Sequence, residues 1–464
     1  MTFLRAHRAL LSTGWASDVA IDIDTAGRIA LLEPAEAGAT SGLVIPGMPN
    51  VHSHAFQRAL AGRAEQAGRG PDAFLMWRQR MYALSRRLAP ADLEVIATLL
   101  YDEMLEAGYT SVCEFHYLHH GPDGAPHADP AAASRALIRA AETAGIRLTL
   151  LPVLYMHAGF GAQPPEPAQA AFVHSVRAYL ALLATLLPAQ SDTLRIGIAF
   201  HSLRAVSPEA MDEVLAWRAS AAPGCPVHIH VAEQLQEVHD CETWSGLRPV
   251  AWLLERGYVD ETWCLVHATH MTGDEIHALA ATAAVAGLCP TTEANLGDGV
   301  FRLGEFLEAG GRIGIGSDSH VSVSPVEELR WLEYGQRLKH GRRNVAASAN
   351  EPNTGARLVR AALAGGRQAL GQDAGRIAAG SAADLVELNA EHPLLVGGDG
   401  DELLDRFVFA GNRPLVANVT VAGRQVVADG RHPLAGPAAA EFAAVMRRLE
   451  RGQVAHGHAR RGIR

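Results

Sequence analysis

Histidine is the unusual residue of this chain of 464 residues, which contains 22 of them. The segment His52-Ser53-His54 places two imidazoles at positions i and i+2, which lie on the same face of a β-strand. Two imidazoles on one face can bind one metal ion, and imidazole suits zinc or iron. By itself His-x-His is a weak signal, because two unrelated surface histidines give the same pattern.

Further histidines and an aspartate stand at the ends of later apolar runs. His228 and His230 lie in HIHVAE, His267 ends TWCLVHAT, and Asp318 lies in GSDSH. The spacing does not decide whether His228 or His230 is a ligand. His267 alone is compatible with a core histidine bonded to the backbone, and Asp318 alone with a cap of the helix near Ser324-Pro325. Together, at the ends of successive runs, they predict one metal-binding cluster.

The elements that must position these side chains are short apolar runs that alternate with helical patterns between residues 47 and 370. Continuous hydrophobic runs are typical of strands buried on both faces, so the pattern predicts an α/β fold, a (β/α)8 TIM-type barrel. Such barrels build their sites at the C-terminal ends of the strands, where the polar residues stand. The eight predicted strands are MPNVHSH, TSVCEFH, RLTLLPVLY, RIGIAFHS, PVHIHVAE, TWCLVHAT, AVAGLCP and RIGIGSDS.

Both ends of the chain have a different, strand-rich character. Before the barrel the sequence predicts short strands and turns, and after it the strands SAADLVELN, DRFVFAG, NVTVAG and RQVVADG. We therefore expect a small β-sandwich domain formed by both chain ends, from residues 1–46 and 371–433, with the barrel over residues 47–370. Residues 434–464 are expected to form a C-terminal helix, from Pro437 to about Glu450, and a loose tail.

Composition and charge exclude several classes of protein. The formal net charge of −10 argues against a nucleic-acid-binding surface. No apolar run of about 18 residues and no signal-peptide core stand out, so we expect a cytoplasmic protein that does not span a membrane. The five cysteines form no Cys-x-x-Cys pair, which indicates buried, reduced thiols.

The order His52-x-His54, His230, His267 and Asp318 along the strands resembles the amidohydrolase superfamily, particularly its deaminase branch. Three longer stretches are similar to the formimidoylglutamate deiminase family: PGMPNVHSHAFQRALAGRAE (46–65), HIHVAEQLQEV (228–238) and CPTTEANLGDG (289–299). No lysine ends the fourth strand, RIGIAFHS, so the carboxylated lysine of binuclear members has no candidate there. The resemblance therefore implies one metal ion per subunit.

The resemblance also implies a reaction and its residues. One Zn²⁺ per subunit, or iron in its place, would be held by His52, His54, His230 and Asp318, with an open position for a water whose pKa falls toward ~7. Asp318 would take the proton of the water, Glu233 would shuttle protons to the substrate nitrogen, and His267 would stabilise the tetrahedral centre. The implied reaction converts N-formimidoyl-L-glutamate, in histidine degradation, to N-formyl-L-glutamate and ammonia. A homodimer is also implied.

A substrate with two carboxylates needs arginine, tyrosine or amide donors around it. The resemblance assigns carboxylate binding to Gln57, Arg78, Tyr117, His201 and Arg204. From the residues alone, Arg78 is equally compatible with a helix-face arginine, because Arg80 offers an equivalent charge, and Tyr117 and His201 with packing around the site. Asn295 fits a turn better than a pocket.

Two alternatives stay open at this point. A deaminase of a heterocycle such as guanine, cytosine or an adenosine derivative would share the metal ligands, and differ in having stacking aromatics in place of arginines. An inactive member of the superfamily, acting as a scaffold or binding protein, would be expected to lack ligands that this sequence retains. A Mg²⁺-dependent phosphohydrolase fits less well, because histidine does not suit that ion.

Overall fold

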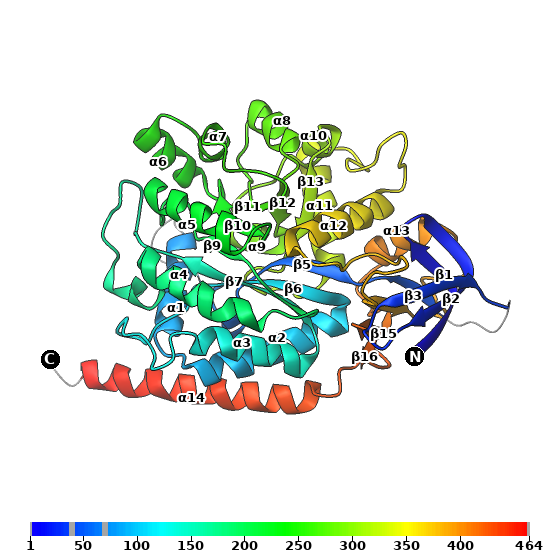
Figure 1. Ribbon diagram of the computed structural model, residues 1–464, viewed down its shortest axis with the longest axis horizontal. Coiled ribbons are helices and arrows are strands. Elements are labelled where there is room, and N and C mark those ends of the chain that lie inside the picture. The colour runs from blue at the N-terminus through cyan, green and yellow to red at the C-terminus, as the bar shows by residue number, and fades with distance from the viewer. Residues whose placement is uncertain (1, 37–41, 67–72, 462–464) are drawn as a thin grey trace.

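The computed structural model describes residues 2–36, 42–66 and 73–461, and its centre is a closed parallel barrel (Figure 1). The barrel is closed, because its last strand, β13, pairs with its first, β5, and β6 pairs with both β5 and β7. Its fourth strand is interrupted at Gly197. The predicted (β/α)8 barrel is confirmed, with a strand in each of the eight predicted runs. The strands are β5 Met48–Ser53, β6 Tyr109–His116, β7 Arg147–Leu154, β8 Leu194–Ile196 with β9 Ile198–Phe200, β10 Val227–Val231, β11 Trp263–His267, β12 Val285–Leu288 and β13 Arg312–Ile315.

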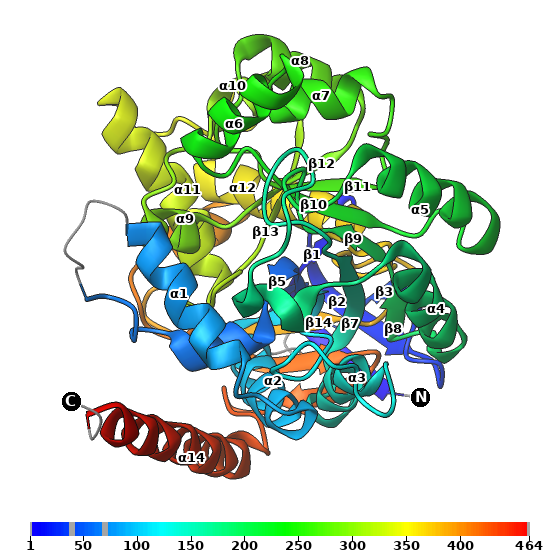
Figure 2. The same ribbon diagram turned by 90° about the vertical axis from the view of Figure 1, so that its left-hand side faces the viewer.

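Helices surround this barrel (Figure 2). Their starts follow local capping chemistry: Ser207 Oγ accepts the N–H of Ala210 at the start of α5, and Ser324 Oγ accepts that of Glu327 at the start of α11. The cap of α11 is thus Ser324, which leaves Asp318 for another role. The helices are α1 Ala73–Ser85, α2 Pro90–Ala107, α3 Ala132–Ala144, α4 Val176–Leu186, α5 Pro208–Ala221, α6 Leu235–Ser245, α7 Pro249–Glu255, α8 Gly273–Ala281, α9 Pro290–Leu296, α10 Leu303–Glu308, α11 Pro325–His340 and α12 Thr354–Leu370.

The last of these helices, α12, packs against β5 and β13. Its residue Ala369 lies in an apolar cluster with Val51, Cys264 and Cys289. All five cysteines are buried and free, as predicted: Cys113, Cys225, Cys241, Cys264 and Cys289.

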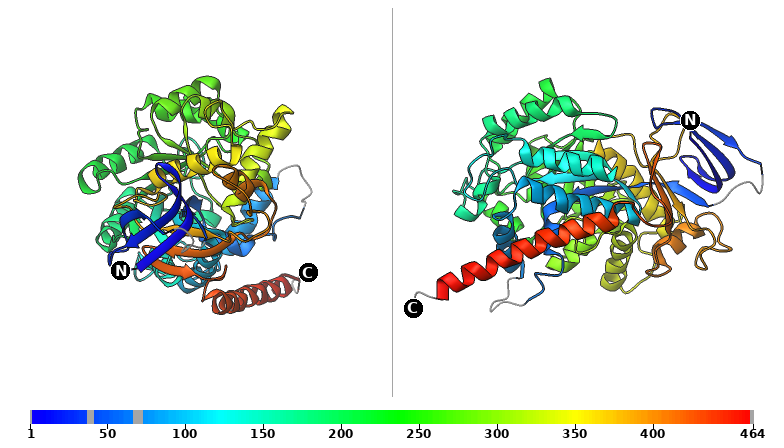
Figure 3. Two further views of the ribbon diagram at one scale, coloured as in Figure 1. Left: turned by 90° about the vertical axis from the view of Figure 1, so that its right-hand side faces the viewer. Right: turned by 90° about the horizontal axis from the view of Figure 1, so that it is seen from below.

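The two chain ends meet in one seven-stranded sheet, beside the barrel (Figure 3). The N-terminal β4 pairs antiparallel with the C-terminal β14, from Leu43 opposite Leu388 to Pro46 opposite Leu385. Within this sheet, only the pairing of β1 with β4 is parallel among the pairs described. The sequence predicted a β-sandwich here. In the structure these strands are hydrogen-bonded into a single sheet of order β16-β15-β14-β4-β1-β2-β3. The bounds are β1 Thr2–Leu11, β2 Gly14–Ile23, β3 Ile29–Pro34, β4 Leu43–Pro46, β14 Leu385–Leu388, β15 Val416–Val421 and β16 Arg424–Val427.

One predicted strand, DRFVFAG, is wrong: residues 405–409 of this run belong to the helix α13, Glu402–Phe409. Leu403, Leu404, Phe407 and Val408 are buried along one helical face, a spacing of three to four residues that a short β-like run conceals. The acidic Glu402 and Asp405 stand in the first turn, where the helix dipole favours them.

The C-terminal helix α14 spans Ala435–Arg461 and is longer than the sequence predicted. It runs along α2, its Met446 and Leu449 are buried, and Arg448 donates a hydrogen bond to Asp92 (Figure 1). Extending an existing helix requires no new nucleus, so residues of weak helix propensity beyond Glu450 can follow the helical path.

One segment corrects the expectation that no apolar run is long enough to cross a membrane. Residues Pro167–Ala189 meet the length and composition of such a span, with a mean hydropathy of 1.6. In the structure the segment is broken into the 3-10 helix η2 Pro167–Phe172, the helix α4 and the 3-10 helix η3 Leu187–Ala189. The 11 residues of α4 rise about 16 Å, which is shorter than the ~30 Å core of a bilayer.

A buried ion pair at the start of the C-terminal segment predicts a pH-dependent stability. His432 Nδ1 lies 3.0 Å from Asp102 Oδ1. Burial alone would lower the pKa of His432, but the nearby carboxylate of Asp102 outweighs burial and raises this pKa above its ordinary value. The ion pair therefore stabilises the fold fully below the unfolded pKa of about 6.5, and this contribution is lost as the pH rises through the raised folded pKa.

We accordingly expect His432→Gln to lower the free energy of unfolding more at about pH 6 than at about pH 9. Urea titrations of both proteins at the two pH values measure this difference. The control His340→Gln changes an exposed histidine at the end of α11 and should show no such trend. An equal loss at both pH values would contradict a charged His432.

Candidate metal centre and active site

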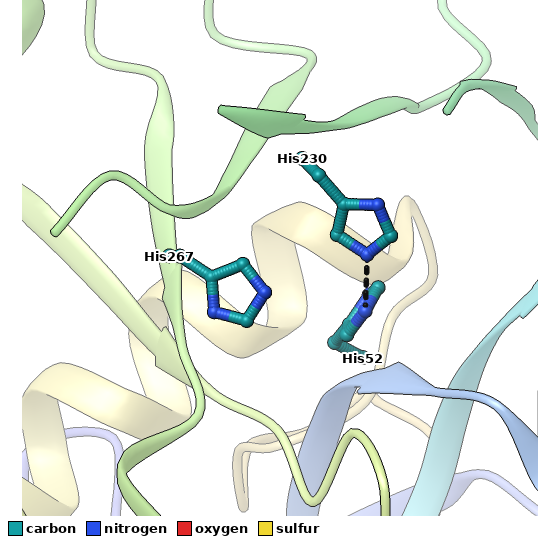
Figure 4. Close-up of side chains that lie close together, drawn as sticks. All are labelled: His52, His230 and His267. Atoms are coloured by element: carbon teal, nitrogen blue, oxygen red, sulfur yellow. Dashed lines mark hydrogen bonds between the residues drawn. The ribbon is translucent and has the colours of Figure 1, made fainter. Parts of the chain in front are cut away.

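Imidazole nitrogens from two strands converge at the C-terminal end of the barrel. The Nε2 atom of His52, in β5, lies 3.1 Å from Nε2 of His54 and 3.0 Å from Nε2 of His230, in β10. Figure 4 shows His230 and His52 with these nitrogens facing each other, and His267 of β11 beside them. The predicted histidines are therefore brought together.

The tautomers of two of these rings leave lone pairs at the centre. His54 Nδ1 lies 2.8 Å from the carbonyl oxygen of Phe115, and His230 Nδ1 lies 3.0 Å from that of His201. A carbonyl only accepts, so each Nδ1 carries the proton and each Nε2 presents a lone pair. Burial lowers the pKa of His52, His54 and His230, which keeps them neutral.

Asp318 completes this donor set. It follows β13, and its Oδ1 atom lies 3.4 Å from Nε2 of both His52 and His54. Its backbone N–H donates to the carbonyl of His52 at 3.0 Å. The Nε2 lone pairs of neutral imidazoles, held about 3 Å apart beside a carboxylate, repel one another. One divalent cation bound between these atoms would attract all of them, so the arrangement fits a metal ion. His52, His54 and Asp318 form one of the donor groups close enough to hold an ion.

The structure resolves the choice between the two histidines of β10. His228 is buried, and its Nε2 bonds to the carbonyl of Ala369 at 2.9 Å. His230, two residues on, meets His52 instead. His228 is thus a core histidine bonded to the backbone and does not join the donor set. His270, which follows β11, bonds to the carbonyl of Asp298 at 2.8 Å and does not join the cluster.

Glu233 and His267 lie beside the donor set. Nε2 of His267 lies 3.8 Å from Glu233 Oε1 and 3.9 Å from Asp318 Oδ2. Burial raises the pKa of Glu233. Burial lowers the pKa of His267, but the carboxylates of Glu233, Glu293 and Asp318 outweigh it and raise this pKa to about 10. Both pKa values are thus raised, and a carboxyl group and an imidazole with perturbed pKa values in one pocket are typical of a functional site.

Backbone strain is concentrated at the same strand ends. Ala232, His267 and Asp318 have φ angles of +51°, +68° and +47°, in the left-handed region that residues other than glycine rarely adopt. Such strain persists where the surrounding contacts fix it, and it is common at active sites. Here the strained backbone accompanies the placement of the Glu233, His267 and Asp318 side chains in one pocket.

Side chains that the sequence analysis did not single out hold these residues in place. The carboxylate of Glu237 accepts the N–H groups of Ala232 and Glu233, at 3.2 and 3.3 Å. Glu293 Oε1 lies 3.3 Å from His267 Nδ1. His320 Nε2 lies 3.2 Å from the backbone nitrogen of His54. All three lie in or beside stretches quoted for the resemblance or the metal cluster, but spacing alone does not reveal a positioning role.

A pocket of about 650 Å³ opens over this cluster. All five residues predicted to bind substrate line it: Gln57, Arg78, Tyr117, His201 and Arg204. Arg80 does not, because it donates to the carbonyl of Arg63 and to Gln66, so Arg78 is the arginine of α1 at the site. Asn295 donates to Glu65 at 2.8 Å, outside the pocket, and belongs to α9, so it is neither a turn residue nor a pocket donor.

The pocket also contains aromatic residues that the sequence analysis did not predict. Tyr155 directly follows β7, and Tyr82 lies on α1 four residues after Arg78, on the same face of the helix. Both positions carried a usable signal. Tyr155 ends the predicted strand RLTLLPVLY, where barrel sites are built, and the helical spacing from Arg78 points to Tyr82.

A (β/α)8 barrel with a histidine and aspartate cluster at the C-terminal ends of its strands defines a class of metal-dependent hydrolases. The chain belongs to the amidohydrolase family, whose pattern it matches over residues 43–426, and residues 1–41 match the pattern described as the N-terminal domain of the formimidoylglutamate deiminase HutF.

Individual relatives agree with this family. Formimidoylglutamate deiminase from Pseudomonas aeruginosa is 54% identical, over 93% of this chain and 96% of its own length. A 5-methylthioadenosine/S-adenosylhomocysteine deaminase from Natronomonas pharaonis is 29% identical over 89% of each chain. The crystal structure of an amidohydrolase from Brucella melitensis superposes with a TM-score of 0.91 and 45% identity, covering 97% of this chain and 100% of the other.

Proposed function

We propose that this protein hydrolyses N-formimidoyl-L-glutamate to N-formyl-L-glutamate and ammonia. The observation that carries the proposal is the pocket, which joins the donor cluster of His54, His230 and Asp318 to two arginines, Arg78 and Arg204. Two guanidinium groups suit a substrate with two carboxylates. The 54% identity to the Pseudomonas deiminase supports the same substrate.

We propose Zn²⁺ as the metal, one per subunit, held by His52, His54, His230 and Asp318. When bound, Zn²⁺ supplies a Lewis acid that lowers the pKa of water toward ~7. Asp318 accepts the proton that the attacking water loses, because its Oδ2 faces the pocket beside His267 Nε2 at 3.9 Å. The water oxygen forms a bond to the formimino carbon and gives a tetrahedral centre. His267, raised in pKa and therefore cationic, stabilises the negative charge that develops there.

Glu233 then carries a proton to the leaving nitrogen. Its carboxyl group lines the pocket and lies 3.8 Å from His267 Nε2. Burial, which raises the pKa of this carboxyl, makes it a better proton carrier near neutrality. The protonated nitrogen leaves as ammonia when the carbon–nitrogen bond breaks. The hydroxyl group that water added to the carbon gives its remaining proton to a carboxylate of the site, so the formyl C=O forms on the glutamate nitrogen and the two water protons are both transferred to the ammonia.

Deaminases of heterocycles are the less favoured reading. The pocket does contain aromatic side chains, but the arginines stand among them, and the nucleoside deaminase from Natronomonas is only 29% identical. Retention of every proposed ligand also disfavours an inactive scaffold.

Ammonia release from N-formimidoyl-L-glutamate, run beside guanine, cytosine and adenosine, tests the function. We expect release from the formimino acid alone, its loss when the metal is removed with a chelator, and its return with zinc. Metal analysis of the same protein should give one ion per chain. Release from a heterocycle instead would keep the metal chemistry and overturn the roles of Arg78 and Arg204.

Arg204 provides a second test, of substrate capture. Its Nε atom is buried without a hydrogen-bond partner among the described residues, and it lines the pocket. Arg204→Ala should raise KM by about 10- to 100-fold, the effect of one lost charge-assisted hydrogen bond, and change kcat less. Steady-state kinetics measure both. The control Arg218→Ala removes an arginine whose bonds go to Cys225 and Thr262. A large fall in kcat with KM unchanged would contradict a capture role.

We further propose that the protein is a cytoplasmic homodimer whose ligands are small molecules, without a nucleic-acid or membrane partner. The net charge of −10 supports the absence of nucleic acid. Analytical ultracentrifugation tests the dimer, and a mass of 49.3 kDa in solution would contradict it.

A further inference from the structure

One hydrogen-bonded group in the pocket has no assigned role in this reaction. The side-chain amide of Gln169, in η2, lies between two tyrosine hydroxyls. Gln169 Nε2 is 2.6 Å from the Tyr155 hydroxyl and 3.3 Å from the Tyr82 hydroxyl. Gln169 is only 4% exposed and Tyr155 only 6%, so the bond between them is shielded from water, whereas Tyr82 is half-buried.

The orientation of the amide is fixed by its other end. Gln169 Oε1 accepts the backbone N–H of Glu166 at 2.7 Å. Oxygen therefore faces the backbone, and the amide NH₂ donates its two hydrogens to the two tyrosine oxygens. Each tyrosine accepts from Gln169 and keeps its own O–H proton for another acceptor.

Counting these protons shows that the network is incomplete. The amide NH₂ only donates, so it takes neither hydroxyl proton. The two hydroxyls are near enough to bond to each other, which uses at most one of the two protons. In the described part of the chain, no other acceptor is bonded to either hydroxyl. At least one O–H therefore remains to be donated into the pocket that both tyrosines line.

The surroundings indicate an anionic acceptor. Arg78 and Arg204 line the same pocket as Tyr155. Burial raises the pKa of Tyr155, and the positive charges of these two arginines act in the opposite direction. An O–H donor beside two cations in a buried pocket matches a carboxylate.

The position of the group selects between the two carboxylates of the substrate. The ring of Tyr155 lies 4.6 Å from that of His201, and His201 lies 5.2 Å from the donor His230. His201 thus lies between Tyr155 and the donor His230, and Tyr155 is further from the proposed metal ligands than His201. In N-formimidoyl-L-glutamate the side-chain carboxylate is the one further from the formimino carbon.

We infer that Tyr155 and Tyr82, oriented by Gln169, bind the side-chain carboxylate of the substrate and set the preference for a dicarboxylate. This inference rests on the proposed function for the identity of the substrate. It makes the two tyrosines specificity residues and Gln169 a positioning residue.

The test compares Tyr155→Phe and Tyr82→Phe with the wild type on two pairs of ligands. The first pair is N-formimidoyl-L-glutamate and N-formimidoyl-L-norvaline, in which a methyl group replaces the side-chain carboxylate. The second pair is the corresponding N-formyl compounds, whose binding is measured by calorimetry without turnover. We expect Tyr155→Phe to raise KM and Kd for the glutamate compounds by about 10- to 100-fold and to leave kcat and the norvaline compounds unchanged.

Gln169→Glu is the sharper variant, because it keeps the size of the side chain and the acceptor for the Glu166 N–H. Its carboxylate would take the hydroxyl protons that Gln169 leaves free and would repel the substrate carboxylate. KM for the dicarboxylate should rise at least as much as in Tyr155→Phe. As a control, Tyr258→Phe removes a hydroxyl that bonds to Asp212, outside the pocket.

The outcomes separate the inference from the proposed function. If the tyrosine variants lose affinity equally for glutamate and norvaline compounds, or if the wild type has no preference between them, the inference is wrong. If the wild type binds N-formyl-L-glutamate preferentially, loses this preference in Tyr155→Phe and yet does not turn over the formimino acid, the dicarboxylate subsite stands and the proposed function fails.

Discussion

Asp318→Asn is expected to reduce kcat by at least about 10³-fold and to weaken metal binding. The carboxylate contacts the donor set through Oδ1, which lies 3.4 Å from Nε2 of both His52 and His54, and it faces His267 through Oδ2. Asparagine has almost the same shape, but its amide carries no charge and does not accept the proton of the attacking water. In the proposed mechanism, one substitution therefore weakens a metal ligand and removes a base.

Metal analysis separates these two losses. Asp318→Asn should contain less metal after purification, and activity should stay low when zinc is added in excess. The matched control Asp274→Asn changes an exposed aspartate on α8 and should leave kcat unchanged. Turnover near the wild-type rate in Asp318→Asn, with zinc bound, would refute the role of this carboxylate.

The barrel and the meeting of the histidine and aspartate side chains were predictable because both depend on one-dimensional signals. A strand buried on both faces is a continuous apolar run, and the barrel topology places the C-terminal end of every such run on one rim. His52, His230, His267 and Asp318 therefore had to be near each other once the runs were recognised as strands. In a closed barrel the last strand, β13, pairs with the first, β5. The meeting of His52 with Asp318 therefore needed no sequence signal of its own.

The sequence did not reveal which of two like residues on one element meets the site. His228 and His230 share the period of a strand, yet the first bonds to the carbonyl of Ala369 and the second meets His52. Arg78 and Arg80 differ in the same way on α1. Which member of such a pair faces the site depends on the packing of distant segments, and that packing has no local signature.

The orienting side chains were missed for a related reason. Gln169 lies in an irregular stretch, η2, far along the chain from Tyr82 and Tyr155, and its role exists only when three segments meet. Short helices raise the same difficulty, as α13 shows, because four apolar residues fit a strand as well as one turn of a helix.

Glu233→Gln is expected to reduce kcat by about 10²- to 10⁴-fold, the range for loss of a general acid or base, with KM changed only a few-fold. Glutamine has the shape of glutamate and retains the backbone N–H that donates to Glu237 at 3.3 Å, so the fold of the strand end should persist. It does not carry a proton from water to the leaving nitrogen. Steady-state kinetics with ammonia detection measure the effect.

Metal content distinguishes this variant from Asp318→Asn. Glu233 is absent from the groups of side chains whose donor atoms are close enough to share an ion, so Glu233→Gln should bind as much zinc as the wild type. The matched control Glu242→Gln changes an exposed glutamate on α6, the helix that follows Glu233, and should be fully active. Full zinc content with a slow chemical step would assign proton transfer to Glu233. Full zinc content with wild-type kcat would instead assign it to His267, the other titratable group 3.8 Å away.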